Sequence, residues 1–256
     1  MRKVRPGRWN LPAIPDDDTP LLLCLPYSGV GATSYRLWPR RVGELTVCAL
    51  QPPGRENRMR EPRPATHREF AVSLAGFLRE LGGRPFALFG HCGAVPYALE
   101  TTRYLAEHGD PLPEWIIASS WGAPDAGLYG RLNFVDLDTH DFVQEIVAMA
   151  RQMGGTLLPE MAAIGAELLR HDQVVQRAYR YPPGHRIEVP VIVLGWTDDE
   201  IVPPHEVFPG WERVTGHLER RTLPGSHFEF LRCPPELQDL IAGLPAATAP
   251  QGRSTA

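Results

Sequence analysis

Short apolar runs alternate with amphipathic segments along most of this chain, and this alternation constrains the fold more than any other feature. Apolar runs of about four to eight residues are typical of buried strands, whereas the segments between them have helical spacing. The runs interpreted as strands are Leu21–Leu25, Thr46–Leu50, Phe86–Phe89, Trp115–Ser119, Val189–Leu194 and Leu218–Leu223. The segments interpreted as helices are Thr66–Leu81, Val95–His108, Asp141–Gln152 and Pro159–Arg170. This order predicts an α/β fold with a mostly parallel central sheet and flanking helices.

Length and composition favour a single globular domain. The chain has 256 residues, of which 43% are apolar and 22% charged. We expect one domain over residues 1–244, and a disordered tail over 245–256, which is rich in Ala, Pro, Gly, Ser and Thr. Residues 122–186 carry no strand signal but contain two predicted helices. A plain crossover needs only one helix, so we interpret this segment as a helical lid over an active site, with a long crossover as the alternative.

Charge and cysteine content exclude several classes of protein. The formal net charge is −4, whereas nucleic-acid-binding proteins usually have a strongly basic surface. The run Leu21–Leu25 is too short for a signal peptide or a membrane span. The four cysteines have no zinc-binding spacing, and we expect no disulfides. We therefore expect a cytoplasmic protein that holds no metal or cofactor and binds neither nucleic acid nor membrane.

One cysteine lies at a sharp turn between a predicted strand and a predicted helix, in the sequence Phe86-Ala87-Leu88-Phe89-Gly90-His91-Cys92-Gly93-Ala94. Gly90 and Ala94 provide the small residues that a nucleophile elbow needs two positions to either side. Such a turn presents its side chain above the sheet at the N-terminus of a helix, which favours the thiolate. Cys92 is therefore the candidate nucleophile, and a buried packing thiol is the alternative. His91 is expected to pack sideways.

A candidate acid and a candidate base follow later strands. Asp199 comes just after one predicted strand, and His227 lies on a glycine-containing loop after the last. Nucleophile, acid and base in this order match the α/β-hydrolase pattern. The spacing to Val202 favours Asp199 over Asp198 and Glu200, although three consecutive acids also suit a solvated turn.

An acyl-transfer site also needs backbone N–H donors that stabilise an oxyanion. Gly93, directly after the candidate nucleophile, is expected to supply one. The second is expected from Tyr27 or Ser28, in the turn after the first predicted strand. The alternative for this segment is an ordinary turn.

Taken in order, four motifs resemble those of type II thioesterases, which are stand-alone α/β-hydrolases associated with nonribosomal peptide and polyketide synthases. They are Leu25-Pro26-Tyr27-Ser28-Gly29, Gln51-Pro52-Pro53-Gly54-Arg55-Glu56, Phe89-Gly90-His91-Cys92 and Pro224-Gly225-Ser226-His227-Phe228. The resemblance extends from about Leu21 to about Leu240. It implies an α/β-hydrolase fold, a triad of Cys92, Asp199 and His227, and a substrate held as a thioester on the phosphopantetheine arm of an acyl or peptidyl carrier protein.

Two residues depart from the family's pattern: Cys92 replaces the usual serine, and Tyr27 replaces a histidine. An acyl group on cysteine is again a thioester, so its formation from a carrier thioester is nearly isoenergetic and reversible. Hydrolysis of acyl or aminoacyl thioesters is the predicted function, and acyl transfer to a second carrier thiol or an amine is the alternative. Cysteine at this position also resembles the aminoacyl shuttles of some nonribosomal pathways. A third hypothesis is an inactive homologue that only binds carrier proteins.

Arginines are frequent in the first quarter of the chain. They are Arg36, Arg40, Arg41, Arg55, Arg58, Arg60 and Arg63. One interpretation is a docking face for an acidic carrier protein. The other is a solvated surface balanced by Glu44, Glu56 and Glu61.

Overall fold

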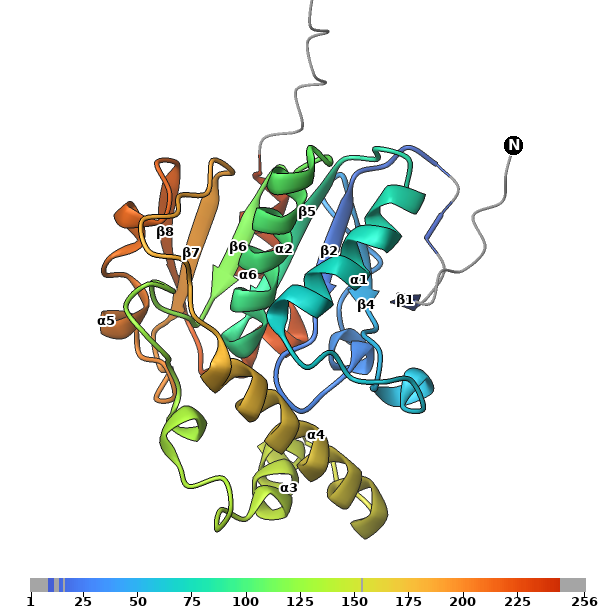
Figure 1. Ribbon diagram of the computed structural model, residues 1–256, viewed down its shortest axis with the longest axis vertical. Helices are drawn as coiled ribbons and strands as arrows, with labels where there is room; N and C mark the ends of the chain where they lie inside the picture. Colours follow the sequence, from blue (N-terminus) through green and yellow to red (C-terminus); the bar gives the residue numbers. More distant parts are fainter. Residues whose placement is uncertain (1–8, 12–13, 16, 153, 245–256) are drawn as a thin grey trace, which may run out of the picture.

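The computed structural model describes residues 9–11, 14–15, 17–152 and 154–244. In this part of the chain, eight strands form one sheet in the order β1-β4-β2-β5-β6-β7-β8, with β3 also paired to β4 (Figure 1). Their bounds are β1 Asn10–Leu11, β2 Leu21–Leu25, β3 Arg41–Val42, β4 Leu45–Leu50, β5 Phe86–His91, β6 Ile116–Ser119, β7 Val191–Trp196 and β8 Leu218–Leu223. All pairs are parallel except β1 and β3 with β4. The predicted α/β class and mostly parallel sheet are confirmed; the expected disordered tail at 245–256 lies outside the described residues.

The four helices predicted from the sequence agree with the structure at most of their ends, whereas two further helices near the C-terminus were not predicted. The bounds of the helices are α1 His67–Glu80, α2 Val95–His108, α3 Phe142–Gln152, α4 Pro159–Ala178, α5 Pro204–Val207 and α6 Pro235–Ala242. The Thr66 hydroxyl caps α1 by accepting a hydrogen bond from the Glu69 N–H at 3.0 Å. Gly109 ends α2 with a left-handed φ of 66°, a conformation that glycine adopts without steric cost.

Alternate residues of the strands form two apolar layers. Leu21 and Leu23 of β2 face the layer covered by α1 and α2, whereas Leu22 faces the layer that contains Leu237 and Ile241 of α6. Figure 1 shows α1 and α2 side by side in front of the sheet and α6 behind it. Because every residue of β2 is buried, this strand has the continuous apolar sequence typical of a central parallel strand.

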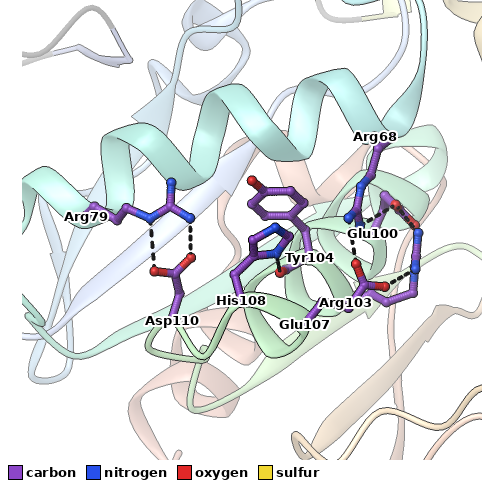
Figure 2. Close-up of polar contacts among 8 residues, drawn as sticks. All are labelled: Arg68, Arg79, Glu100, Arg103, Tyr104, Glu107, His108 and Asp110. Atoms are coloured by element: carbon purple, nitrogen blue, oxygen red, sulfur yellow. Dashed lines mark hydrogen bonds and ion pairs between the residues drawn. The ribbon is translucent and has the colours of Figure 1, made fainter.

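Ion pairs join α1 to α2, as Figure 2 shows. The buried Glu100 carboxylate accepts hydrogen bonds from the Arg103 guanidinium at 2.9 and 2.6 Å. Arg68 of α1 reaches across to Glu107 of α2 at 2.6 Å. Because α2 follows the Cys92 turn directly, these contacts hold the helix that comes after the candidate nucleophile.

The long segment between β6 and β7 contains α3 and α4, which pack against each other beyond one end of the sheet (Figure 1). A small apolar cluster of Phe142, Ile146, Ala166 and Leu169 joins them. The predicted end of α4 at Arg170 is wrong, because the helix continues to Ala178. The apolar pattern breaks there because the helix buries polar side chains, namely Asp172, Gln173 and Gln176.

None of the helices described is both long and apolar enough to cross a membrane.

Candidate active site

Cys92 occupies a strained turn at the end of β5. Its backbone has a φ of 52°, a left-handed conformation that is uncommon for any residue other than glycine. A Cβ atom at Gly90 would lie 3.1 Å from Ala94 and from Val95, so a larger residue would push the turn open. Of the four cysteines, only Cys92 is not buried. The turn therefore has the geometry expected of a nucleophile elbow.

His227 and Asp199 contact each other beyond the ends of β8 and β7. The Nδ1 atom of His227 lies 2.8 Å from Oδ2 of Asp199. The other oxygen, Oδ1, accepts the N–H groups of Ile201 and Val202 at 2.9 and 2.8 Å. Asp198 and Glu200 are exposed, so Asp199 is the acid of the three that the fold brings to His227.

Ser120, which no motif in the sequence marks, also contacts this acid. It follows β6 directly, has a φ of 51°, and its hydroxyl donates a hydrogen bond of 2.7 Å to Oδ2 of Asp199. The signal that could have found it is a pair of hydroxyl residues, Ser119 and Ser120, at the carboxyl end of a strand adjacent to the elbow strand. Its hydroxyl restricts the position of the carboxylate.

The charges of this group reinforce one another. Burial raises the pKa of Asp199, but hydrogen bonds from His227, Val202 and Ser120 outweigh burial and lower this pKa below its ordinary value. Burial lowers the pKa of His227, but interactions with Asp199 and with the Cys92 side chain outweigh burial and raise it to about 9. A protonated imidazole beside a cysteine can stabilise a thiolate, which is the nucleophilic form.

His91 packs beside this group, as its neighbours show. His91 is fully buried, and its Nδ1 lies 2.9 Å from the Ser119 hydroxyl oxygen. Its ring stacks on the ring of Phe230, with 3.8 Å between the two ring centres. Burial, with the nearby charge of His227, holds the pKa of His91 well below its ordinary value. The His91 ring is therefore neutral. It packs edge to face against the ring of His227, with 4.5 Å between the two ring centres.

The three residues expected at the oxyanion site lie around Cys92. Tyr27 and Ser28 line the same cavity as Cys92 and His227. Gly93 is buried, and a Cβ atom there would lie 2.5 Å from the Ser28 hydroxyl oxygen. The turn after β2 and the turn after β5 are thus adjacent, as two backbone donors converging on one oxygen atom require.

Gln176 of α4 was missed from the sequence, yet it lies against both turns. Its Nε2 donates a hydrogen bond of 2.7 Å to the Ser28 hydroxyl, which is 148 residues away in the chain. The same atom would be 1.7 Å from a Cβ atom at Gly93, so position 93 has room only for glycine. Asn133 donates to the Gln176 carbonyl at 3.2 Å. The sequence gives no signal for the contact between Gln176 and Ser28, because a single glutamine on a helix has no pattern that points to a distant partner.

A buried ion pair fixes the loop after β2. Asp172 of α4 accepts the Gly29 N–H at 2.8 Å through one oxygen and the Arg55 guanidinium at 2.8 Å through the other. Arg55 also donates to the Val30 carbonyl at 2.6 Å. The loop that carries Ser28 is therefore held by α4 on one side and by Arg55 on the other.

Replacing Asp172 by asparagine should lower the free energy of unfolding by about 3 kcal/mol, because it leaves the buried Arg55 charge without its partner. Chemical denaturation measures this change. The control is Asp138→Asn, which removes an exposed partner of Arg170 and should cost less than about 1 kcal/mol. Equal losses in the two variants would contradict the structural role assigned to Asp172.

The cavity above Cys92 has a volume of about 200 Å³. Residues of the sheet loops, including Cys92 and His227, line one side of it, and residues of α3 and α4 line another. The α3 and α4 residues in its wall are Glu145, Ala148, Met149, Gln152, Leu169, Gln173 and Gln176. Within the described residues, no group of three or more His, Cys, Asp or Glu side chains is arranged to hold a metal ion. A cysteine that shares a cavity with a carboxylate-bound histidine is an arrangement that can support nucleophilic attack on an acyl group.

Comparisons with known proteins identify relatives along most of the chain. The profile of the thioesterase domain family matches residues 20–243. The gramicidin S biosynthesis protein GrsT of Aneurinibacillus migulanus is 27% identical over 215 residues, which cover 81% of each chain. Among solved structures, the RedJ thioesterase of the prodiginine pathway in Streptomyces coelicolor is 30% identical, with a TM-score of 0.73 over 90% of this chain and 87% of that one.

The type II thioesterase BorB from the borrelidin biosynthetic cluster is 29% identical, with a TM-score of 0.72 over 93% of this chain and 98% of its own. The predicted resemblance to type II thioesterases is thereby confirmed. The chain belongs to the thioesterase domain family and has an α/β-hydrolase fold.

Proposed function

We propose that this protein cleaves acyl or aminoacyl thioesters from the phosphopantetheine arm of a carrier protein, through an acyl-enzyme on Cys92, in nonribosomal peptide or polyketide biosynthesis. One observation carries the proposal: a cysteine in a left-handed turn shares a cavity with His227, whose ring contacts Asp199 at 2.8 Å. The names of the relatives support the pathway class, since GrsT is a gramicidin S biosynthesis protein and RedJ is a prodiginine pathway thioesterase.

The proposed reaction has two steps. In the first, the Cys92 sulfur bonds to the thioester carbonyl carbon, and the oxyanion receives the N–H of Gly93 and that of Tyr27 or Ser28. The carbon–sulfur bond to the pantetheine then breaks, and the protonated His227 gives its proton to the leaving thiolate. In the second step, neutral His227 takes a proton from water, the water oxygen bonds to the acyl carbon, and the Cys92 thiolate leaves.

In this proposal, the segment at about 122–186 acts as a lid within a single domain. Seven of its α3 and α4 residues line the cavity, so it covers the place where the acyl group would bind. The contacts of Asp172 with Gly29 and of Gln176 with Ser28 tie this segment to the oxyanion loop. Covering the acyl-enzyme limits the access of water.

Acyl transfer is the alternative that the cysteine itself favours. The Cys92 acyl-enzyme is a thioester, so a second carrier thiol can attack it without a large loss of free energy, whereas an oxygen ester on serine would favour water as the final acceptor. Transfer uses the same first step and the same residues, and it differs only in the group that accepts the acyl chain.

Replacing Cys92 by serine should raise the ratio of free acid to transferred acyl group, because the oxygen ester lies downhill from the carrier thioester. The test mixes each enzyme with an acyl-loaded carrier and an unloaded second carrier, and mass spectrometry measures free acid and the newly loaded carrier. For the wild-type enzyme, we expect mainly free acid. Persistent loading of the second carrier with little acid would replace hydrolysis by transfer. A serine variant with an unchanged product ratio would show that the sulfur does not set the outcome.

A further inference from the structure

A second pocket adjoins the cavity that contains Cys92. Its volume is about 60 Å³, and it shares Gln152 and Phe228 with that cavity. Phe228 follows His227 directly, so the pocket begins next to the candidate base. Its lining also includes two exposed arginines, Arg36 and Arg232.

These two arginines make the second pocket positively charged. The Arg36 guanidinium has no hydrogen bond or ion pair with any residue that the structure describes. Arg232 has one long contact, 3.8 Å, with the carboxylate of Glu229, which also lines the pocket. The lining therefore contains two arginines and one acidic residue, and Ser226 also belongs to it.

The other arginines of the first quarter do not provide such a site. Arg55 and Arg58 are buried and paired with Asp172 and Glu61, so the expectation of an exposed docking face is wrong for these two. Of the seven arginines in that cluster, Arg36 is the one that lines the pocket beside the cavity. Its guanidinium is free to bind a ligand there.

We propose that the pocket of Arg36 and Arg232 binds the phosphate of the pantetheinyl arm while the thioester lies at Cys92. This inference rests on the function proposed above. Guanidinium groups bind phosphate oxygens through paired, charge-assisted hydrogen bonds, and arginine forms them better than lysine. Phe228 and Gln152 lie in the lining of both pockets, so in this proposal the uncharged part of the arm lies along them, between the thioester and the arginines.

The first experiment compares acyl-phosphopantetheine with acyl-pantetheine, which lacks only the phosphate. The wild-type enzyme should have a kcat/KM roughly tenfold or more higher for the phosphorylated substrate. The Arg36→Ala/Arg232→Ala double variant should lose this preference through a higher KM and retain its rate on acyl-pantetheine. Arg60→Ala, which removes an exposed arginine outside both pockets, should retain the preference. A preference unchanged in the double variant would overturn the proposal.

A second comparison separates the phosphate from the carrier surface. If the arginines bind phosphate, the double variant loses rate both with an acyl-loaded carrier and with the corresponding acyl-coenzyme A. A loss confined to the carrier would overturn the proposal and assign the arginines to the protein surface of the partner.

Calorimetry tests the pocket without turnover. Phosphopantetheine should bind the Cys92→Ala enzyme more tightly than pantetheine, and the double arginine substitution should remove the difference. Equal binding of the two compounds before that substitution would overturn the phosphate site. If phosphate-dependent binding is present but no thioester is cleaved by the wild-type enzyme, the phosphate site stands and the proposed function fails.

Discussion

Replacing Cys92 by alanine should reduce kcat for thioester cleavage by roughly a millionfold, as the loss of a nucleophile that acts together with its base generally does. The reason is that the variant has no atom that can form the acyl-enzyme. The cavity, His227 and Asp199 would remain in place, because alanine is smaller than cysteine and fits in the same space. At a φ of 52° the backbone of either residue is strained, so the substitution adds no new strain. Substrate should therefore still bind while turnover is lost.

Two measurements check this result. Intact-protein mass spectrometry should find the acyl adduct on the wild-type enzyme and none on the variant. Cys48→Ala is the matched control, because Cys48 is a buried thiol in the core and its loss should leave kcat close to the wild-type value. Turnover within tenfold of wild type in the Cys92 variant would mean that water, or another side chain, attacks the thioester directly.

Replacing His227 by alanine should slow acylation of Cys92 by roughly four to six orders of magnitude. The imidazole that stabilises the sulfur anion and protonates the leaving thiolate is then absent. A single-turnover experiment that follows the acyl adduct on Cys92 measures this step apart from hydrolysis. The control is His205→Ala on the exposed surface of α5, which should acylate at the wild-type rate. An acylation rate within tenfold of wild type in the His227 variant would show that another group activates Cys92 and protonates the leaving thiolate.

The same variant should differ from the wild type in how its stability depends on pH. Because the pKa of His227 rises from 6.5 to about 9 in the folded protein, the protonated ring stabilises the fold. This contribution is fully present below pH 6.5 and is lost as the pH rises through about 9. It amounts to about 3 kcal/mol. Denaturation at a series of pH values should therefore find that wild type loses more stability than His227→Ala between these limits.

Local patterns predicted the central strands and the first two helices closely. The bounds of β2 and α2 match their predictions because each combines an apolar pattern with a clear start or stop, such as Gly109 after α2. The bounds of β8 also match, although most of this strand is polar. The two-residue strands β1 and β3 were not predicted, since two residues carry no periodicity. Helix α4 was predicted too short, because burial of Asp172 and Gln176 depends on partners far away in the chain.

The candidate nucleophile, acid and base were chosen from the sequence because each follows a strand, and parallel strands place their carboxyl ends at one edge of a sheet. The roles assigned to Cys92, Asp199 and His227 stay predictions, while their proximity is a property of the structure. Among the acids, burial rather than spacing separates Asp199 from Asp198 and Glu200. The second pocket brings together Arg36 and Arg232, which no local pattern relates.

The sequence by itself determined the α/β class, the strained turn at Cys92 and the order of the candidate residues, because these depend on periodicity and on small residues at fixed short spacing. Only the tertiary structure decided which polar side chains surround that turn. Ser120, Asp172 and Gln176 make hydrogen bonds to Asp199, Gly29 and Ser28, which are 79 to 148 residues away in the chain. Such contacts arise from the packing of separate elements, and the energy of packing is not encoded in any short segment.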